Sequence, residues 1–381
     1  MTACLFGTYD RRHSANRLLA MALAGAGFAV EELHVPLWEE TRYKTRGYFG
    51  VASLAGLAVR WARAAGTLAR RWRARAGAPP IVVVGFGGVL DVLLARRVCR
   101  PRAGLVFAPL VSLTETLVDD RAVFRAGGLR ARAARALDRR TFRAADLVLA
   151  DTAAHAAYLR ELGAPAVDVW PLGAEPEFLP AREGVPAPRR VLFYGRYLPL
   201  HGVDTIVRAA ALLGAAAEVV LVGGGPERPA VEALAHALGA PVTFRDERPL
   251  AEMPGELASA AVVLGVFGAG QKAAMVVPNK VYQAAAAGRP LVTRDSPALR
   301  EVLEPERHCV VCPPADPAAL AAAVARLLDD PTLAARLGRA ARAHVLDAFS
   351  PARQAARLAA VLERRLGVVA AAGEPRRAAD A

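Results

Sequence analysis

The chain has few of the residues that build disulfide-stapled, zinc-bound or membrane-spanning proteins. Four cysteines among 381 residues are too few for a disulfide scaffold of this size. Cys309 and Cys312 form a CxxC, but only His308 lies near them, and a structural zinc site needs four ligands. The uncharged run 257–271 is broken by glycine and is shorter than the roughly 18–20 apolar residues that span a bilayer. These absences favour a globular protein.

Two further signatures are missing. Gly85-Phe86-Gly87-Gly88 follows a predicted strand, but it is not the GxGxxG of a dinucleotide site. No DxD-type motif stands on a loop after a strand, and Asp119-Asp120 is an isolated pair. We therefore expect neither a dinucleotide cofactor nor a bound metal.

Lysine is also scarce, because only Lys44, Lys272 and Lys280 occur among 49 basic residues. Two of the three lie in the stretch 268–303, where a buried strand leads into a helix that begins at Pro278. The first turn of a helix offers unpaired N–H groups and a positive dipole, so Lys280 marks a place to hold an anion. A solvated helix end with chance lysines is the alternative.

Positive charge is what the chain has in excess, with a net charge of +13. Arginines concentrate in two segments of helical spacing, 60–75 and 121–143. Trp61, Leu68 and Trp72 recur at helical spacing in the first, so an anionic membrane surface is a candidate partner. Solvated arginine-rich faces are the plainer interpretation, and no motif supports nucleic acid. The N-terminus lacks signal-peptide order, so we expect a cytoplasmic protein, peripheral on the inner membrane face if the membrane interpretation holds.

The order of predicted elements indicates an α/β protein with two domains. Strands and helices alternate through residues 1–180, a Pro-rich linker follows, and the alternation starts afresh through 188–349. We predict two Rossmann-like, doubly wound parallel sheets facing across a cleft, with ligands at the carboxyl ends of the strands. Segments 38–50 and 108–120 are predicted loops, and the tail 368–381 is expected to be disordered.

Three segments of the second half occur in a characteristic order: GRYLPLHGVDTIVRAA at 195–210, LVGGGPE at 221–227 and VPNKVYQAAAAGRPLVTRDSPALREVL at 277–303. They resemble the retaining glycosyltransferases of the GT-B fold, in the large group 1 or family 4 class, and within it a divergent VPNK-type subgroup. The resemblance implies transfer of a sugar from a nucleotide-sugar donor of UDP or GDP type to a glycan, lipid-linked or small-molecule acceptor, without metal or other cofactor. The donor would lie on the second domain, and helix 350–367 would cross back onto the first.

The resemblance also implies donor roles for particular residues. Arg196 would contact the donor diphosphate, and His201 stands where the family usually has lysine. The family's two acidic positions fall on Met275 and Gln283, and a glutamine still hydrogen-bonds a ribose hydroxyl. The further donor-binding residues that we expect are Gly195, Gly202, Gly223, Gly224, Phe244, Arg245, Pro278 and Asn279.

The chemistry of such a transfer agrees with these positions. A leaving nucleoside diphosphate gains negative charge as the glycosidic bond breaks. Arg196, Lys280 and the helix N-terminus would stabilise that charge where it develops. We therefore assign Arg196 and Lys280 to catalysis.

Candidates on the acceptor side are less specific. Gly7, Arg17 and Gly87 flank predicted cleft loops of the first domain. Glu115 follows a strand end and is the carboxylate that we assign to accept the acceptor's proton, with Asp119 as its alternative. A hydrogen-bonded loop carboxylate without a catalytic role is the plainer interpretation of either.

Two other functions stay open. A catalytically degenerate GT-B-fold binding protein is motivated by the neutral residues Met275, His201 and Gln283, where charged ones are usual. A sugar-epimerising or phosphorolytic enzyme of similar fold would need different phosphate-binding residues, and nothing specific in the sequence supports it.

Overall fold

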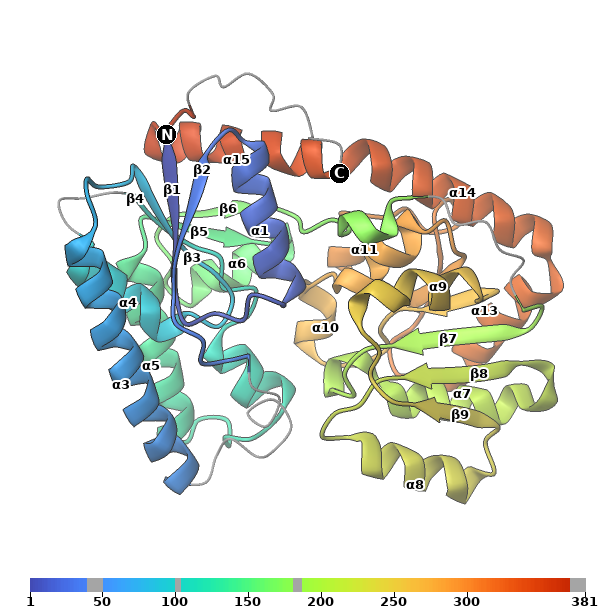
Figure 1. Cartoon of the computed structure of the whole chain (residues 1–381). Coiled ribbons are helices and arrows are strands. Elements are labelled where there is room, and N and C mark those ends of the chain that lie inside the picture. Colours follow the sequence, from blue (N-terminus) through green and yellow to red (C-terminus); the bar gives the residue numbers. More distant parts are fainter. Residues whose placement is uncertain (40–50, 100–103, 181–186, 371–381) are drawn as a thin grey trace.

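Two parallel six-stranded sheets, each with helices on both faces, make up the computed structural model (Figure 1). The structure describes residues 1–39, 51–99, 104–180 and 187–370. Most of the predicted loop 38–50 and of the predicted tail 368–381 lies outside the described residues. The predicted α/β class with two doubly wound parallel sheets is confirmed. We call each sheet with its covering helices the first and the second unit.

The first sheet has the strand order β2-β1-β3-β4-β5-β6. In β3 the side chains of Ile81 and Val83 enter one hydrophobic cluster, and those of Val82 and Val84 enter another. Both faces of the strand are therefore covered, which explains its uninterrupted β-branched sequence. The strands are β1 (Thr2–Gly7), β2 (Ala29–His34), β3 (Ile81–Val84), β4 (Gly104–Phe107), β5 (Leu147–Ala150) and β6 (Val167–Val169). The helices are α1 (Ser14–Gly25), α3 (Val51–Ala74), α4 (Val89–Val98), η1 (Glu115–Asp120), α5 (Leu129–Ala144), α6 (Ala153–Glu161) and η2 (Pro176–Phe178).

The second sheet has the strand order β12-β11-β10-β7-β8-β9. The chain enters it at β7, so the carboxyl ends of β7, β8 and β10 lie next to one another. The strands are β7 (Arg190–Tyr194), β8 (Glu218–Val222), β9 (Val242–Arg245), β10 (Val262–Leu264), β11 (Leu291–Arg294) and β12 (Val310–Cys312). The helices are η3 (Pro199–His201), α7 (Val203–Leu213), η4 (Gly214–Ala216), α8 (Arg228–Leu238), η5 (Leu250–Glu252), α9 (Met253–Ala258), α10 (Gln271–Met275), α11 (Asn279–Ala286), α12 (Pro297–Arg300), α13 (Pro317–Asp329), α14 (Pro331–Ala348) and α15 (Pro351–Leu366).

The last helix, α15, runs along the first unit and packs against α1 (Figure 1). A Cβ added to Gly25 of α1 would meet the Ala355 Cβ at 2.9 Å. The Trp170 indole N–H donates to the Gln354 carbonyl at 3.1 Å, and Leu358 is buried in the same contact. Helix α15, near the end of the described residues, is thus packed against α1, near their beginning.

The segment 108–120, predicted as a loop, ends in a π-helical turn, η1. Ser112 and Glu115 explain why a helix starts here. The Glu115 N–H donates to the Ser112 hydroxyl at 2.9 Å, and the Ser112 N–H donates to the Glu115 carboxylate at 3.1 Å. This reciprocal pair is a capping box, which favours a helix over a loop.

The apolar stripe of α3 faces inward, which corrects its interpretation as a membrane-facing surface. Leu68 and Trp72 are buried in the core of the first unit, and the Trp61 indole N–H donates to the Asp91 carboxylate at 2.9 Å. The stripe recurs at helical spacing because it packs on the sheet. Within the described ranges, no helix is both long and apolar enough to cross a membrane.

This orientation of α3 is testable by one pair of truncations. Leu68→Ala should lower the free energy of unfolding by about 2–5 kcal/mol, because it leaves a cavity in the core. Val59→Ala, on the same helix but 53% exposed, should change it by less than about 0.5 kcal/mol. Chemical denaturation of both variants measures the difference, and equal effects would contradict the burial.

Candidate functional site

Three strand ends of the second sheet meet through glycine. A Cβ on Gly223, after β8, would lie 2.1 Å from the Gly195 carbonyl oxygen, after β7. A Cβ on Gly202 would lie 2.6 Å from the Gly268 nitrogen, after β10. Gly195, Gly202 and Gly223 also have positive φ angles of 134°, 60° and 130°, and residues other than glycine adopt such angles only at a cost in free energy. The predicted glycines therefore bring the three backbones into contact, at the edge where parallel sheets bind ligands.

Lys280 brings a basic side chain to this edge. It is the second residue of α11, and its Nζ lies 3.8 Å from the centre of the Phe193 ring. A Cβ on Gly195 would meet this Nζ at 2.9 Å, so the ammonium group lies directly against the loop of Arg196. The Nζ is buried and has no hydrogen-bond partner among the described residues. Burial holds the pKa of Lys280 well below its ordinary value.

His201 contributes no charge to the site. The ring is buried, and its Nδ1–H donates to the Arg196 carbonyl oxygen. Burial and the neighbouring Lys280 hold the pKa of His201 well below 6.5, so the imidazole is neutral at physiological pH. The residue that stands in place of a lysine thus orders the Arg196 loop through a hydrogen bond, while Arg196 itself is half-buried in that loop.

Gln283 is held in a buried network. Its Nε2 donates to the Glu175 carboxylate at 2.8 Å, and its Oε1 accepts from the Tyr194 hydroxyl at 2.8 Å. Asn279 approaches the same carboxylate with its Nδ2 at 3.5 Å. Both predicted donor residues therefore point at Glu175, which is fully buried and which the sequence interpretation missed. Glu175 stands in the Pro-rich connection between the units, at the end of the segment PLGAE, 171–175.

A cavity of about 540 Å³ lies at the end of β9. The Arg228 guanidinium donates hydrogen bonds to the Asp246 carboxylate, at 2.6 Å, and to the Gly223 carbonyl oxygen, at 3.1 Å. It therefore links the lining of the cavity to the backbone after β8. The cavity has room for a planar ring system beside the predicted residues Phe244 and Arg245. The residues that line it are Arg228, Phe244, Arg245, Asp246, Glu247, Arg248 and Pro249.

The predicted acceptor-side glycines make room for neighbouring side chains of the first unit. A Cβ on Gly7 would lie 2.5 Å from the Asp91 carboxylate, and one on Gly87 would lie 3.5 Å from the Trp38 ring. Asp91 accepts hydrogen bonds from the N–H and the hydroxyl of Thr8, and burial raises its pKa. Trp38 donates to the same hydroxyl at 3.2 Å. Gly7 and Gly87 are therefore brought together around Thr8.

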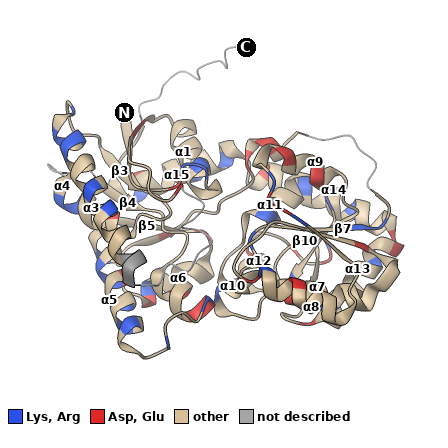
Figure 2. Cartoon of the chain, turned by 60° about the horizontal axis from the view of Figure 1, so that its bottom comes forward, with Lys and Arg blue, Asp and Glu red and all other residues tan. Residues whose placement is uncertain are grey.

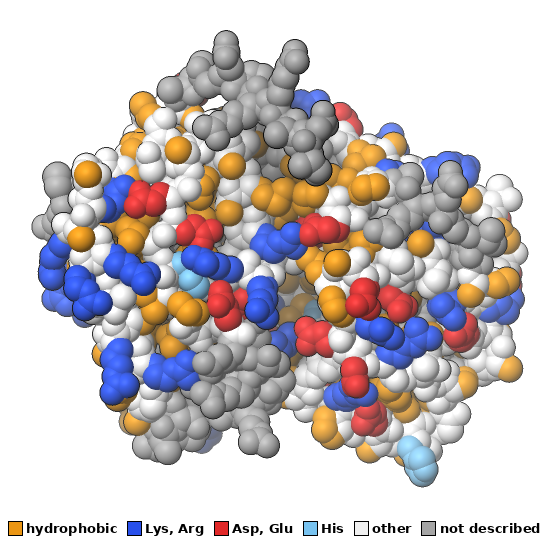
Figure 3. Space-filling model, in the orientation of Figure 1, with side chains coloured by type: hydrophobic (Ala, Val, Ile, Leu, Met, Phe, Trp, Pro, Cys, Tyr) orange, Lys and Arg blue, Asp and Glu red, His pale blue; other side chains and the backbone are white. Residues whose placement is uncertain are grey.

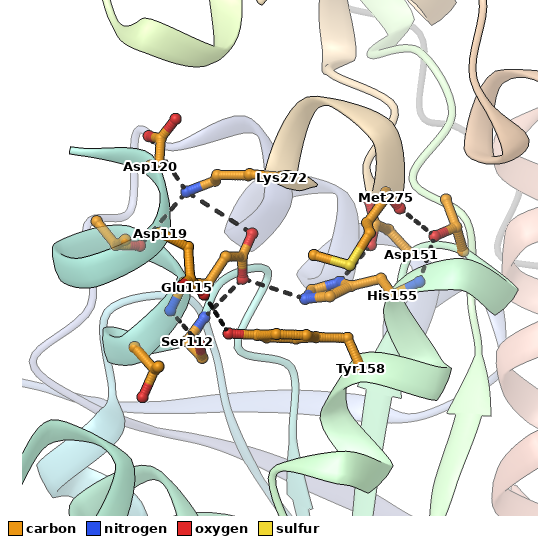
Figure 4. A network of polar contacts seen from close by, with 12 residues as sticks. Ser112, Glu115, Asp119, Asp120, Asp151, His155, Tyr158, Lys272 and Met275 are labelled. Atoms are coloured by element: carbon orange, nitrogen blue, oxygen red, sulfur yellow. Dashed lines mark hydrogen bonds and ion pairs between the residues drawn. The ribbon is translucent and has the colours of Figure 1, made fainter. Parts of the chain in front are cut away.

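The other predicted first-unit residues lie elsewhere. Arg17 forms an ion pair with Glu177 of the connection between the units. Glu115 is fully buried in an ionic cluster where the units meet (Figure 4). Its alternative, Asp119, accepts a hydrogen bond from the Tyr158 hydroxyl at 2.8 Å.

Basic and acidic side chains stand side by side across the middle of the face in Figure 3, where the two units adjoin.

Comparison with known proteins bears on the second unit most directly. Residues 188–330 match the family model of Glycosyl transferases group 1. The chain is 31% identical to MMP alpha-(1->4)-mannosyltransferase of Mycolicibacterium hassiacum over 216 residues, which cover 53% of this chain and 49% of that enzyme. It is 31% identical to alpha-D-kanosaminyltransferase of Streptomyces kanamyceticus over 158 residues, covering 39% and 38%. The chain thus spans at most about half the length of these relatives.

Solved structures match the whole architecture. Sucrose-phosphate synthase of Thermosynechococcus elongatus superposes with a TM-score of 0.74 at 19% identity, covering 96% of this chain and 98% of that one. Anabaena Alr3699/HepE, solved in complex with UDP and glucose, superposes with a TM-score of 0.70 at 16% identity, covering 95% and 99%. These likenesses confirm the predicted GT-B fold.

The contact between the β7 and β8 ends gives a matched pair of variants. Gly223→Ala should lower the free energy of unfolding by about 2–4 kcal/mol, through backbone strain and the clash with Gly195. Gly224→Ala should be nearly neutral, because its added Cβ would meet no atom closer than 3.9 Å. Thermal denaturation compares the two, and equal melting temperatures would contradict the geometry described for Gly223.

Proposed function

We propose that this protein is a retaining, metal-independent glycosyltransferase that moves a sugar from a nucleotide-sugar donor to an acceptor. The observation that carries the proposal is the buried amino group of Lys280, which lies against the Gly195–Arg196 loop and has no hydrogen-bond partner in the described part of the chain. A buried cation without a counter-charge is unfavourable unless an anion joins it. The match of residues 188–330 to Glycosyl transferases group 1 supports a donor diphosphate as that anion.

The proposed reaction places charge where these cations lie. The acceptor's hydroxyl oxygen bonds to the anomeric carbon as the bond between that carbon and the phosphate oxygen breaks. The electrons of the broken bond stay on the nucleoside diphosphate, and the departing phosphate oxygen takes the acceptor's proton. Arg196, Lys280 and the first N–H groups of α11 stabilise that charge as it develops. With His201 neutral, Lys280 supplies the charge that a lysine in the loop would otherwise bring.

We assign the donor site to residues 188–349 and the acceptor site to residues 1–180. We place the protein in the VPNK-type subgroup of the group 1 glycosyltransferases. The cavity beside Phe244 and Arg245 suits the nucleoside. The UDP complexes of HepE support a UDP-type donor, with GDP as the second candidate. Gly7 and Gly87 then mark the acceptor side, for a glycan, lipid-linked or small-molecule acceptor.

A catalytically degenerate sugar-nucleotide-binding protein is the second candidate. It is favoured by the engagement of Gln283 with Glu175 and Tyr194, which occupies one of the two N–H groups of the amide and one lone pair of its oxygen. The two candidates share the donor pocket and differ in turnover. A nucleotide at about 100 times its dissociation constant should stabilise either protein by roughly 2.7 kcal/mol, whereas only the enzyme consumes the matching nucleotide sugar.

Lys280→Met tests the assignment by opposite effects on stability and binding. Because burial lowers the pKa of Lys280 from 10.5, the unfolded chain binds this proton more tightly than the folded protein. The resulting destabilisation is largest at low pH and is lost as the pH rises toward the ordinary value. We expect the variant to melt above the wild type at neutral pH, by a margin that shrinks toward pH 10, and to turn over roughly 10²–10³-fold more slowly.

Thermal melts from pH 6 to 10, titration with UDP and GDP, and turnover of the nucleotide sugar measure these effects. Arg196→Ala should lose turnover to a similar extent, and Arg208→Ala, on the exposed face of α7, should keep it. Wild-type affinity for both nucleotides in Lys280→Met would remove Lys280 from the diphosphate site.

We also propose that the arginine-rich helices of the first unit dock on an anionic membrane. The supporting observation is the exposed arginine face of α3 and α5, seen in blue in Figure 2, together with Leu129, which is 82% exposed. The exposed arginines of these two helices are Arg63, Arg70, Arg71, Arg73, Arg130, Arg132, Arg135, Arg139, Arg140 and Arg143.

Co-sedimentation with phosphatidylserine-containing vesicles tests this docking. Binding should be strong at low salt and lost at about 0.5 M salt, since counter-ions screen exposed charges. A variant with Arg130, Arg135 and Arg139 changed to Gln should bind more weakly, and neutral vesicles should not bind the protein. Absence of binding to anionic vesicles at low salt would remove the proposal.

A further inference from the structure

Four buried charged side chains of alternating sign run from the first unit into the second (Figure 4). Asp151 lies 2.7 Å from the Nδ1 of His155, and the Nε2 of His155 lies 3.4 Å from the Glu115 carboxylate. Glu115 lies 3.8 Å from the Nζ of Lys272, which comes from α10 of the second unit. We call these four residues the interdomain bridge.

Each member of the bridge has a fixed position. Asp151 follows β5 directly, and His155 lies in the first turn of α6. Glu115 is held at the start of η1 by its capping box with Ser112. Lys272 also approaches the Thr116 hydroxyl, at 3.3 Å. The bridge thus joins the end of β4, through η1, to the end of β10, through α10.

The charges of the bridge balance. Burial lowers the pKa of His155, but Asp151 and Glu115 outweigh it and raise the pKa to about 10, so the ring is positive at neutral pH. Burial raises the pKa of Glu115, but His155 and Lys272 outweigh it and leave the pKa lowered. Two negative and two positive groups result. Asp120, 4.0 Å from Lys272, has a pKa raised by burial.

The segment that carries Lys272 is embedded in the first unit. Met275 and Val276 belong to the hydrophobic core cluster of the first sheet, although they follow β10 of the second. The Thr152 hydroxyl donates to the Met275 carbonyl oxygen. The side chain at 275 is therefore committed to contact between the units.

Separation of the units would break the bridge at one place. Lys272 would leave with α10, and Glu115 would stay beside His155 and Asp151 with one negative charge in excess. A buried ionic group that loses its partner is strongly destabilising, whereas removing both partners together is often nearly neutral. At this place the contact between the units therefore relies on Lys272 and Glu115 as a pair.

We propose that Lys272 is a positioning residue, which acts through Glu115 to hold the two units in the arrangement described here, with the proposed donor site of the second unit facing the proposed acceptor side of the first. The functional part of this inference rests on the proposed glycosyltransferase activity, whereas the effect on domain arrangement does not.

The distance between the units in the full-length protein tests the proposal directly. Spin labels on Leu129→Cys and Leu212→Cys, exposed positions on different units, report that distance by pulsed electron paramagnetic resonance. The native cysteines are all buried, and the protein without the two added cysteines measures their background labelling. We expect a narrow distribution in the labelled parent and a clearly broader one with Lys272→Met added.

Further variants separate the bridge from packing in general. Glu115→Gln, which keeps the volume, should broaden the distribution as Lys272→Met does. The double variant Lys272→Met/Glu115→Gln should be narrower than Lys272→Met, because no uncompensated charge remains. Glu301→Ala removes an exposed contact between the units, from Glu301 to the N–H groups of Ala153 and Ala154, and should match the labelled parent.

The proposal is overturned if Lys272→Met keeps the parental distribution, if the double variant is as broad as Lys272→Met, or if Glu301→Ala broadens it equally. UDP binding, measured by calorimetry on the same proteins, should change less than about threefold, since Lys272 is engaged with the first unit. A wild-type protein that binds no nucleotide would count against the proposed function, while the distances would still decide whether the bridge holds the units.

Discussion

The buried amino group of Lys280 is the feature on which the candidate site depends. It lies against the Phe193 ring and the backbone of Gly195, and among the described residues it has no hydrogen-bond partner. A positive charge there is costly in an empty protein and favourable beside an anion. The glycines around it let the backbones after three strands come into van der Waals contact. The same backbone that buries the Lys280 amino group therefore also shapes the site where an anion would bind.

The two ionic systems of the molecule are built on opposite principles. The interdomain bridge pairs every charge, from Asp151 through His155 and Glu115 to Lys272. The site at Lys280 leaves its amino group without a hydrogen-bond partner among the residues that the structure describes. A paired buried chain specifies one arrangement of its parts, and an unpaired charge invites a ligand. The two lysines of the described residues thus have different places: Lys272 lies between the units, and Lys280 lies at the proposed donor site.

Sequence patterns predicted the elements better than they predicted side-chain roles. Asp316 and Asp330 cap α13 and α14, and each stands directly before a Pro at the first helical position. A cap of this kind can be read from the sequence because it acts within one turn of chain. The sequence left the direction of the Trp72 side chain open, since a stripe at helical spacing has the same pattern whether it packs on a sheet or on a membrane, and the structure places Trp72 in the core. The helical turn at Glu115 was missed although its capping box with Ser112 is a local signal.

The sequence by itself determined the alternation of strands and helices, the two parallel sheets, the glycine-rich strand ends and the placement of Lys280 in a first helical turn. These depend on neighbours within a few residues. Tertiary structure alone decided that His201 is neutral, that Gln283 meets Glu175, and that Glu115 meets Lys272. The partners of the last two are more than a hundred residues away in the chain, and burial sets the charge of the first. A local sequence pattern shows neither which distant residues meet in the fold nor which side chains are shielded from water.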